Sequence, residues 1–597
     1  MNDAIRYQVV LHDPAAHLFA IRLTLAAPDP DGQRFRLPAW IPGSYLVRDF
    51  ARNIVSIRAE SGGRPVALHK LDKHSWQAAP CAGALTLEYQ VYAWDLSVRA
   101  AHFDQTHAFF NGSSLFLCAL GHEQAPHVVD LRRPAGARYR AWRVATALPE
   151  LAAPRYGFGT YVAASYDELI DHPVEIGDFA LATFEAHGVP HDFVLSGRVP
   201  NADLERLCAD LKKICEAQIA LFEPRTLAAP MTRYVFLTLA VGDGYGGLEH
   251  RASTALLCSR ADLPVLGKPE TSDGYRGFLG LCSHEYFHTW NVKRIKPAVF
   301  APYDLRSENY TPLLWLFEGF TSYYDDLMLV RSGVIDEAAY LKLVARTVNS
   351  VLRGSGRFRQ SVAESSFDAW TKYYRQDENA PNAIVSYYTK GSLVALALDL
   401  TIRAGSGGRK SLDDVMRMLW QRYGRDFYAP DGSGGRGLAE ADLVAVFDAA
   451  TGLKLGRAIR RFTEGTDDLP LARLLAPFGI KWDDGAASAK PALGARAVAA
   501  GSECRLANVY EGGAAHRAGL SGGDLLVALD GLRVSASNLE TLLARYRVGE
   551  RLTLHAFRRD ELMAFTVELM ADDTPRVTLT AAPGSAKKRA GWLRGGR

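Results

Sequence analysis

The sequence predicts a multidomain α+β protein with an N-terminal β-sandwich, a mostly helical middle region and a compact C-terminal unit. The chain has 597 residues, too many for one hydrophobic core, since a domain holds roughly 100–200 residues. Two changes of pattern divide it. The hydrophobic period changes from two to about 3.6 near Pro200. A stretch rich in Gly, Ala, Ser and Pro, typical of a linker, follows at 484–494.

The first 175 residues have the pattern of half-buried strands. Apolar and polar residues alternate at 21–25 and again at 85–92, which is the period of a strand with one face on a core. Pro and Gly interrupt these runs, as at 38–43. Short strands separated by turns predict a β-sandwich over residues 1–175.

The middle region, 176–483, follows a helical repeat with one strand. Apolar residues recur at helical spacing from Leu204 to Phe222, and a strand from Tyr234 to Ala240 leads into a glycine-rich turn at 242–247. Further helices are predicted at 278–290, 313–331, 335–353 and 390–404.

Charge and composition exclude several classes of protein. The net charge is +3; the tail from Asp573 carries six Lys and Arg against one acid, +5, which leaves about −2 for the body. Such a body offers no electrostatic footprint for nucleic acid, and we expect the basic tail, 573–597, to be flexible. No apolar run is long enough to span a membrane.

The cysteines and the first residues bear on the compartment. Seven cysteines without a C-x-x-C pair indicate reduced, buried thiols. The first 25 residues lack the apolar segment of a secretory signal. We therefore expect a cytoplasmic protein, or a periplasmic one if a signal was removed.

One short segment, His284-Glu285-Tyr-Phe-His288, has the metal-binding pattern H-E-x-x-H. Residues four apart lie on one face of a helix, so both imidazoles can reach one Zn²⁺ with bonds of about 2.0–2.1 Å. The carboxylate of Glu285 can accept the proton of the attacking water. The motif also arises by chance on amphipathic surface helices, so alone it favours neither interpretation.

Glu318 is the candidate third ligand, because catalytic zinc sites usually take three protein ligands. Aromatic and aliphatic residues flank it in the predicted helix 313–331. We expect a half-buried carboxylate, which needs a cation; a solvated acidic face is the alternative. Asp325 is expected to support a ligand histidine. The prediction is one Zn²⁺ per chain, held by His284, His288 and Glu318.

Several motifs, in order, resemble known metallopeptidases. H-E-x-x-H with Trp-Leu-Phe-Glu-Gly-Phe at 315–320 resembles the gluzincin zinc metallopeptidases, which have a thermolysin-like catalytic domain and are related to the aminopeptidase-N family. Gly-Gly-Leu-Glu-His at 246–250 resembles the exopeptidase strand G-x-M-E-N of that family, and Tyr-Thr-Lys-Gly at 388–391 its Y-x-K-G segment. With Trp-Ile-Pro-Gly-Ser-Tyr at 40–45 and the C-terminal unit, almost the full length is similar to the PDZ-containing glycyl aminopeptidase family.

The resemblance implies roles for several residues. Glu249 would bind the free α-amine of the substrate, Gly246 and Gly247 would let the substrate backbone approach as an added strand, and Tyr388 would donate to the oxyanion. For the glycines a plain hairpin turn is equally compatible with the sequence. Tyr387 is the rival of Tyr388 as the donor. The segment reads Gly-Gly-Leu-Glu-His rather than G-x-M-E-N, so amine recognition could differ.

The resemblance further implies a thermolysin-like peptidase domain at 176–483 and a PDZ domain at 488–572, in which Leu493-Gly494 is the candidate carboxylate-binding turn. The expected function is an aminopeptidase that releases small residues, Gly or Ala, from peptides with a free N-terminus. The PDZ domain would bind a C-terminal peptide tail, of a substrate or a partner, or have a purely structural role against the catalytic domain. Two alternatives stay open: a PDZ-bearing endopeptidase, and a PDZ adaptor with an idle peptidase domain.

Overall fold

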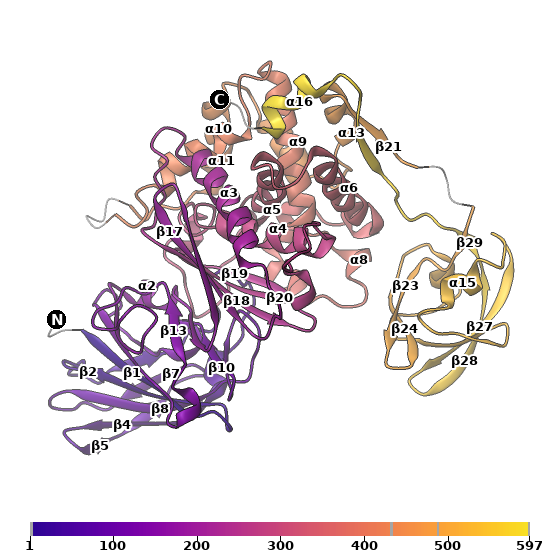
Figure 1. Ribbon diagram of the computed structural model, residues 1–597. Helices are drawn as coiled ribbons and strands as arrows, with labels where there is room; N and C mark the ends of the chain where they lie inside the picture. The colour runs from indigo at the N-terminus through magenta and orange to yellow at the C-terminus, as the bar shows by residue number, and fades with distance from the viewer. Residues whose placement is uncertain (1–3, 430–433, 486–488, 595–597) are drawn as a thin grey trace. The chain divides into compact units, whose positions relative to one another are not determined.

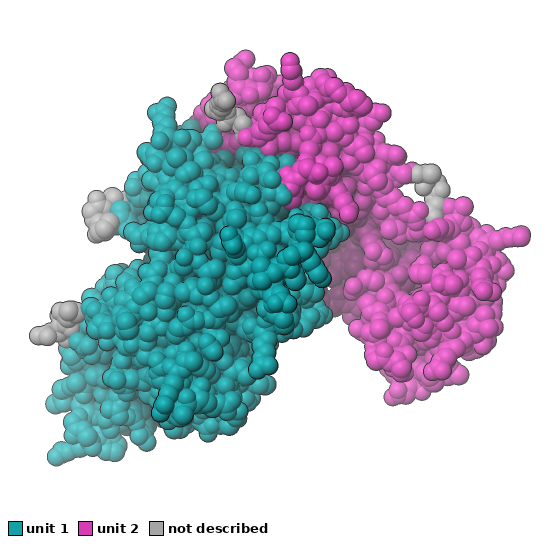
Figure 2. Space-filling model, viewed as in Figure 1, with its two compact units in different colours: residues 1–309, 324–334, 416–439 teal, residues 310–323, 335–415, 440–597 magenta. Residues whose placement is uncertain are grey.

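A computed structural model of the protein describes residues 4–429, 434–485 and 489–594 (Figure 1). The chain folds into two compact units, coloured separately in Figure 2. Unit 1 comprises residues 1–309, 324–334 and 416–439, and unit 2 comprises residues 310–323, 335–415 and 440–597.

The N-terminal region of unit 1 is β-rich, as the alternating pattern predicts. Its largest sheet has the order β14-β12-β1-β2-β8-β4-β5. The pairing is antiparallel except between β1 and β12, which run parallel. The strands are β1 (Ile5–Asp13), β2 (Leu18–Leu25), β4 (Ile54–Ser61), β5 (Arg64–Val66), β8 (Leu85–Tyr92), β12 (His127–Arg132) and β14 (Gly159–Ala163). In β8, buried and more exposed positions alternate, which is the expected burial of a strand with one face on a core.

Two four-stranded sheets complete this region, with the orders β13-β15-β10-β9 and β11-β3-β7-β6. The strands are β3 (Arg34–Arg36), β6 (Leu68–Lys70), β7 (Ser75–Ala78), β9 (Ala101–Phe103), β10 (His107–Phe110), β11 (Cys118–Ala119), β13 (Arg143–Thr146) and β15 (Val174–Gly177). Apolar residues of all three sheets share one buried core, for example Leu87, Phe110 and Phe35.

A five-stranded sheet, β16-β17-β18-β20-β19, follows in the same unit. Its strands are β16 (Ala180–Ala186), β17 (Val189–Ser196), β18 (Tyr234–Val241), β19 (Tyr245–Glu249) and β20 (Ser253–Ser259). The predicted turn at 242–247 ends early, because Gly246 and Gly247 pair with Leu257 and Leu256 inside β19. β19 is an edge strand of this sheet, a position at which another strand can add, and its Gly247 carbonyl oxygen accepts a hydrogen bond from Arg99 Nη2 at 3.5 Å.

The helices α3 (Leu204–Phe222) and α4 (Asp273–Phe287) also belong to unit 1. α4 starts earlier than the predicted range 278–290, because the Ser272 side chain accepts a hydrogen bond from the Tyr275 N–H and caps the helix. It also ends earlier, with His288 as its C-cap.

Unit 2 contains the helices predicted at 335–353 and 390–404, which are α6 (Glu337–Arg353) and α9 (Thr389–Gly405). The helix α5 (Leu314–Arg331) is shared, since residues up to 323 are grouped with unit 2 and the remainder with unit 1. The C-terminal β-sheet has the order β23-β24-β25-β27-β28, with β26 on β25, and its own apolar core. Its elements are β23 (Ala495–Ala500), β24 (Glu503–Val509), α14 (Ala514–Arg517), β25 (Leu525–Leu529), β26 (Leu532–Arg533), α15 (Leu539–Leu543), β27 (Arg551–Arg558) and β28 (Glu561–Glu568).

The prediction that the tail, 573–597, is flexible is wrong for the residues that the structure describes there. β30 (Thr578–Ala581) pairs with β21 (Ile480–Asp483), and α16 (Ala586–Leu593) buries Trp592 and Leu593. Two apolar anchors outweigh the positive charge of the segment, because one buried tryptophan removes a large apolar surface from water. The predicted linker at 484–494 and the domain start at 488 include residues 486–488, which lie outside the described residues.

All seven cysteines are free thiols, as expected. Among the residues that the structure describes, no helix has the length and apolar character needed to cross a membrane.

Candidate metal centre

The helix α4 brings the two motif histidines together. His284 lies in its last turn and His288 at its C-cap, and their Nε2 atoms are 3.1 Å apart. Two ligands of a tetrahedral ion with bonds of about 2.05 Å are about 3.3 Å apart. The observed separation is therefore close to that of two imidazoles on one ion.

Both imidazoles are oriented by hydrogen-bond acceptors at their Nδ1 atoms. His284 Nδ1 lies 2.9 Å from Asp325 Oδ2, the contact expected from the sequence, and His288 Nδ1 lies 2.7 Å from the carbonyl oxygen of Asn291. A carboxylate and a carbonyl accept only, so Nδ1 carries the proton in each ring and Nε2 presents a lone pair. Two facing lone pairs repel each other, and a cation between them removes that repulsion.

Glu318 completes a set of three potential ligands. One ligand atom from each of His284, His288 and Glu318 lies within 4.8 Å of the other two. Glu318 is 2% exposed, so it is fully buried and not half-buried as predicted. A carboxylate at such a depth needs a compensating cation. Two neutral imidazoles and one carboxylate fit a zinc-type ion with an open fourth position.

Two glycines bring the helix of Glu318 against the helix of the Tyr388 segment. A Cβ at Gly319 would lie 2.6 Å from the Cα of Gly391, and one at Gly391 would lie 3.0 Å from the Cα of Gly319. α5 and α9 therefore touch backbone to backbone. The sequence motifs containing these glycines gave no sign that they meet.

The two candidate tyrosines differ in their surroundings. Tyr387 is fully buried, and burial, with the nearby Tyr374 hydroxyl and Glu318 carboxylate, raises its pKa well above the usual value. Tyr388 is partly exposed, and its hydroxyl lies 3.3 Å from that of Tyr374. Of the two tyrosines, only Tyr388 has a side chain open to its surroundings.

Glu249, the last residue of β19, lies beside the motif helix. One ligand atom from each of Glu249, Glu285 and His288 lies within 4.8 Å of the other two, and all three residues are buried. Gly247 makes room for this arrangement, since a Cβ there would lie 2.0 Å from Glu285 Oε1. At Gly246 the nearest atom to a Cβ is 3.7 Å away, on Arg99. The two glycines, equivalent in the sequence, therefore have different surroundings.

Gly43 is a site residue that sequence reasoning missed. It belongs to the segment Trp-Ile-Pro-Gly-Ser-Tyr, has a φ of +96°, and a Cβ there would lie 2.5 Å from Glu249 Oε2. The positive φ and the close approach both favour glycine. His250 stands in place of the asparagine of G-x-M-E-N. Its side chain contacts Asp171, with Nδ1 3.2 Å from Asp171 Oδ1.

The fold and the site define a metallopeptidase of the H-E-x-x-H type, with three potential metal ligands and a separate carboxylate, Glu285, next to His288. Residues 6–178 match the Peptidase M61 N-terminal domain and residues 277–394 match the M61 glycyl aminopeptidase family. The chain is 43% identical to an aminopeptidase N family protein from Idiomarina loihiensis of known crystal structure. That match covers 99% of this chain and 100% of the other, with a TM-score of 0.93.

The protein belongs to the M61 glycyl aminopeptidase family. The predicted family and the predicted class of enzyme, a metallo-exopeptidase acting on peptides, are thereby confirmed. An M1 zinc metallopeptidase from Deinococcus radiodurans is also similar, at 15% identity over 79% of this chain and 94% of the other, with a TM-score of 0.47. No curated protein sequence matches the chain significantly.

Proposed function

We propose that the protein is a zinc aminopeptidase that releases small N-terminal residues, Gly or Ala, from peptides with a free α-amine. The observation that carries the proposal is the buried Glu249 carboxylate, within 4.8 Å of ligand atoms of Glu285 and His288. A fixed anion next to the reacting groups binds a cation, and only the end of a peptide offers an ammonium group there. The preference for small residues rests on membership of the glycyl aminopeptidase family.

The ion would be held by His284, His288 and Glu318, and when bound it polarises the scissile carbonyl and acidifies water. Side chains of the protein supply the proton transfers and the hydrogen bond to the oxyanion. Glu285 accepts the proton of the attacking water and passes it to the leaving amine. Tyr388 donates its hydroxyl hydrogen to the developing oxyanion.

The edge strand β19 would align the substrate. An extended peptide can add to a free strand edge through main-chain hydrogen bonds. Gly246 presents no side chain to an added peptide, and Gly247 lets Glu285 lie against the strand. The substrate N-terminus then ends at Glu249, the last residue of β19.

Paired substrates test the amine site. We expect rapid hydrolysis of glycyl and alanyl reporters and none of their N-acetyl derivatives, because acetylation removes the positive charge. Glu249→Gln should lower kcat/KM for the free-amine substrates about 100-fold or more, the cost of leaving a buried ammonium group without its anion. Hydrolysis of N-acetyl peptides at similar rates, with little effect of Glu249→Gln, would establish an endopeptidase instead.

The matched variant Glu285→Gln separates chemistry from binding. It should retain stoichiometric zinc and lose turnover by at least about 10³-fold, because the general base is removed. A zinc-loaded wild-type protein that cleaves no free-amine peptide would favour the adaptor alternative.

Phenylalanine substitutions distinguish the two tyrosines. Tyr388→Phe should reduce kcat about 10²–10³-fold with little change in KM, as expected for a donor to the transition state. Tyr387→Phe keeps the buried ring and should have a far smaller effect on kcat. The reverse order would assign the oxyanion role to Tyr387.

We further propose the finer domain types: an N-terminal β-sandwich, a thermolysin-like catalytic domain and a C-terminal PDZ domain. Support for the last is a groove whose lining includes Leu493, Gly494 and Ala495 together with Leu539 and Ala544 of the α15 region, and also Leu352 and Arg353 of α6. Peptides with an apolar C-terminal residue should bind there, and amidation of that terminus should abolish binding, as measured by fluorescence anisotropy.

A further inference from the structure

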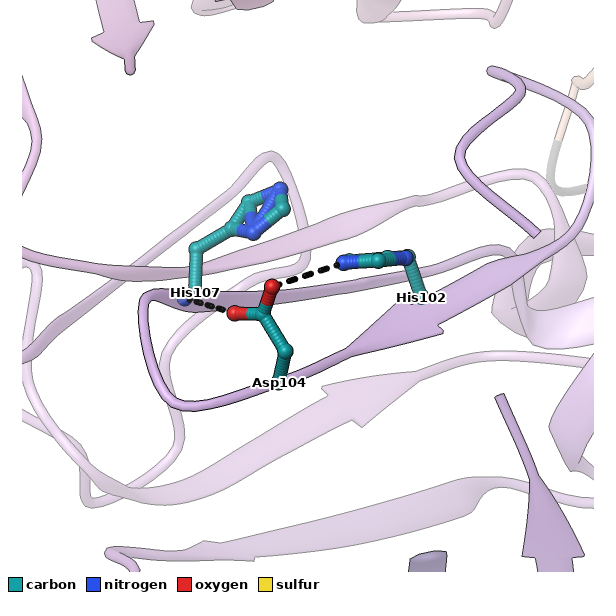
Figure 3. A group of neighbouring side chains, drawn as sticks. All are labelled: His102, Asp104 and His107. Atoms are coloured by element: carbon teal, nitrogen blue, oxygen red, sulfur yellow. Dashed lines mark hydrogen bonds and ion pairs between the residues drawn. The ribbon is translucent and has the colours of Figure 1, made fainter. Parts of the chain in front are cut away.

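A second group of potential metal ligands lies in the N-terminal β-rich region, in the hairpin formed by β9 and β10. His102 is on β9, His107 begins β10, and Asp104 is in the turn between them. One ligand atom from each lies within 4.8 Å of the others. Figure 3 shows the His102 ring directed at the Asp104 carboxylate, with the His107 ring beside them.

The turn itself uses only one oxygen of Asp104. Oδ1 accepts hydrogen bonds from the backbone N–H groups of Thr106 and His107, at 2.6 and 3.1 Å, and from the Thr106 hydroxyl at 2.6 Å. Oδ2 lies 3.3 Å from His102 Nε2. A turn stabilised by an aspartate needs the first oxygen, so the turn does not explain why the second meets an imidazole.

His107 is the least explained residue of the group. Its side chain is 7% exposed, and neither ring nitrogen has a hydrogen-bond partner within the described part of the chain. His102 is 5% exposed, and its Nδ1 also has no hydrogen-bond partner among the described residues. Buried polar atoms in folded proteins are almost always hydrogen-bonded or ligated, so these nitrogens point to a bound ion or water.

A small cavity adjoins these side chains. It has a volume of about 20 Å³ and is lined by His102, His107 and Glu175, with apolar walls that include Phe109 and Leu237. This space holds a single water or ion. Burial lowers the pKa of His107 to about 4, so its imidazole is neutral at pH 7, the form that binds metals.

We propose that His102, Asp104 and His107 bind a second zinc-type divalent ion, separate from the catalytic one, that staples the β9–β10 hairpin. Two imidazoles and one carboxylate suit Zn²⁺. Ligands of a tetrahedral ion are about 3.3 Å apart, so separations of at most 4.8 Å need to close by no more than about 1.5 Å. No hydrogen bond from the described residues holds the His107 ring in its present position.

Zinc stoichiometry tests the proposal. Each protein is saturated with Zn²⁺, desalted and analysed by mass spectrometry of the metal. We expect two ions per wild-type chain, one for His107→Gln, and one for the double variant His284→Gln/His288→Gln. The matched control His127→Gln should keep two, because His127 is also a buried imidazole but its Nδ1 already bonds to the Ala125 carbonyl oxygen.

The double variant keeps the two sites distinguishable. It should bind one zinc, and X-ray absorption should show two imidazole nitrogens on that ion; binding of none would overturn the proposal, whatever the catalytic site does. His107→Gln should keep aminopeptidase activity and its one zinc. If that variant fails to fold, the stoichiometries of the wild type and of the double variant still decide. One zinc in the wild type together with none in the double variant would mean that a water fills the cavity.

Discussion

At the metal centre, Asp325 allows ligation to be separated from ligand orientation. Its carboxylate lies 2.9 Å from His284 Nδ1. Asp325→Asn should weaken zinc binding about 10–100-fold, because the amide accepts a weaker hydrogen bond and lowers the basicity of the ring. Competition with a chelator measures this affinity, and excess zinc should restore activity. Asp326→Asn, at the next position of α5, is the control, and equal affinities in both variants would exclude the orienting role.

A buried imidazole makes the N-terminal region sensitive to acid. Burial lowers the pKa of His127 to about 4, against about 6.5 in an unfolded chain. The unfolded chain therefore takes up a proton first as the pH falls below 6.5, and the native state loses stability until about pH 4. Between pH 7.5 and pH 5 the loss is about 2 kcal/mol.

His127→Gln should remove this part of the pH dependence. Urea unfolding of both proteins at the two pH values, followed by a probe in the N-terminal region, gives the difference. The variant should lose about 2 kcal/mol less than the wild type on acidification. Parallel losses would mean that His127 titrates normally in the folded protein. Zinc release at low pH affects both proteins equally and cancels in the comparison.

Among single residues, the sequence predicted those that form local patterns. His284, Glu285 and His288 follow from helical spacing, and Glu318 follows from the number of ligands that zinc needs. The role of Gly43 could not be predicted from the sequence, because its contact with Glu249 joins positions about 200 residues apart. No periodicity within one element reports such a contact.

At the scale of elements, β19 and α4 approach so closely that a single methyl group decides their spacing. A Cβ at position 247 would lie 2.0 Å from Glu285 Oε1, whereas at position 246 no atom lies within 3.4 Å of one. Gly247→Ala should therefore displace the general base and reduce kcat about 10²-fold or more. Gly246→Ala should retain zinc and most of kcat, with its effect confined to KM. Similar kcat values for the two variants would show that Glu285 can adjust without loss.

The same strand shows where element prediction fails. Glycine has low strand propensity, so the sequence 242–247 reads as a turn, and only pairing with β20 makes Gly246 and Gly247 part of a strand. The helices, by contrast, carry an apolar stripe of their own, and α6 and α9 lie within two residues of their predicted bounds. The crossing of α5 and α9 at Gly319 and Gly391 depends on two backbones meeting, which an apolar stripe does not encode.

At the scale of the molecule, the order of a β-rich region, a helical region and a C-terminal β-sheet followed from the changes of hydrophobic period. The tail did not, because its basic composition concealed two apolar residues that anchor it. Trp592 is 1% exposed, and its Nε1 donates a hydrogen bond to the Tyr323 hydroxyl at 2.9 Å. Tyr323 lies on α5, five residues after Glu318, so the end of the chain contacts the helix of the third ligand.

This contact makes the stability of unit 2 depend on the last helix of the chain. Trp592→Ala removes a buried side chain packed against Tyr340 and Phe478, and should cost about 3–5 kcal/mol. Lys588→Ala, at an exposed position of the same helix, should leave stability unchanged, since lone surface charges contribute little. Thermal unfolding of zinc-loaded protein measures both. A mobile basic tail predicts wild-type behaviour for both variants, whereas an anchored one predicts that Trp592→Ala alone lowers the Tm. Loss of zinc from that variant at lower temperature would further show that the anchor supports α5.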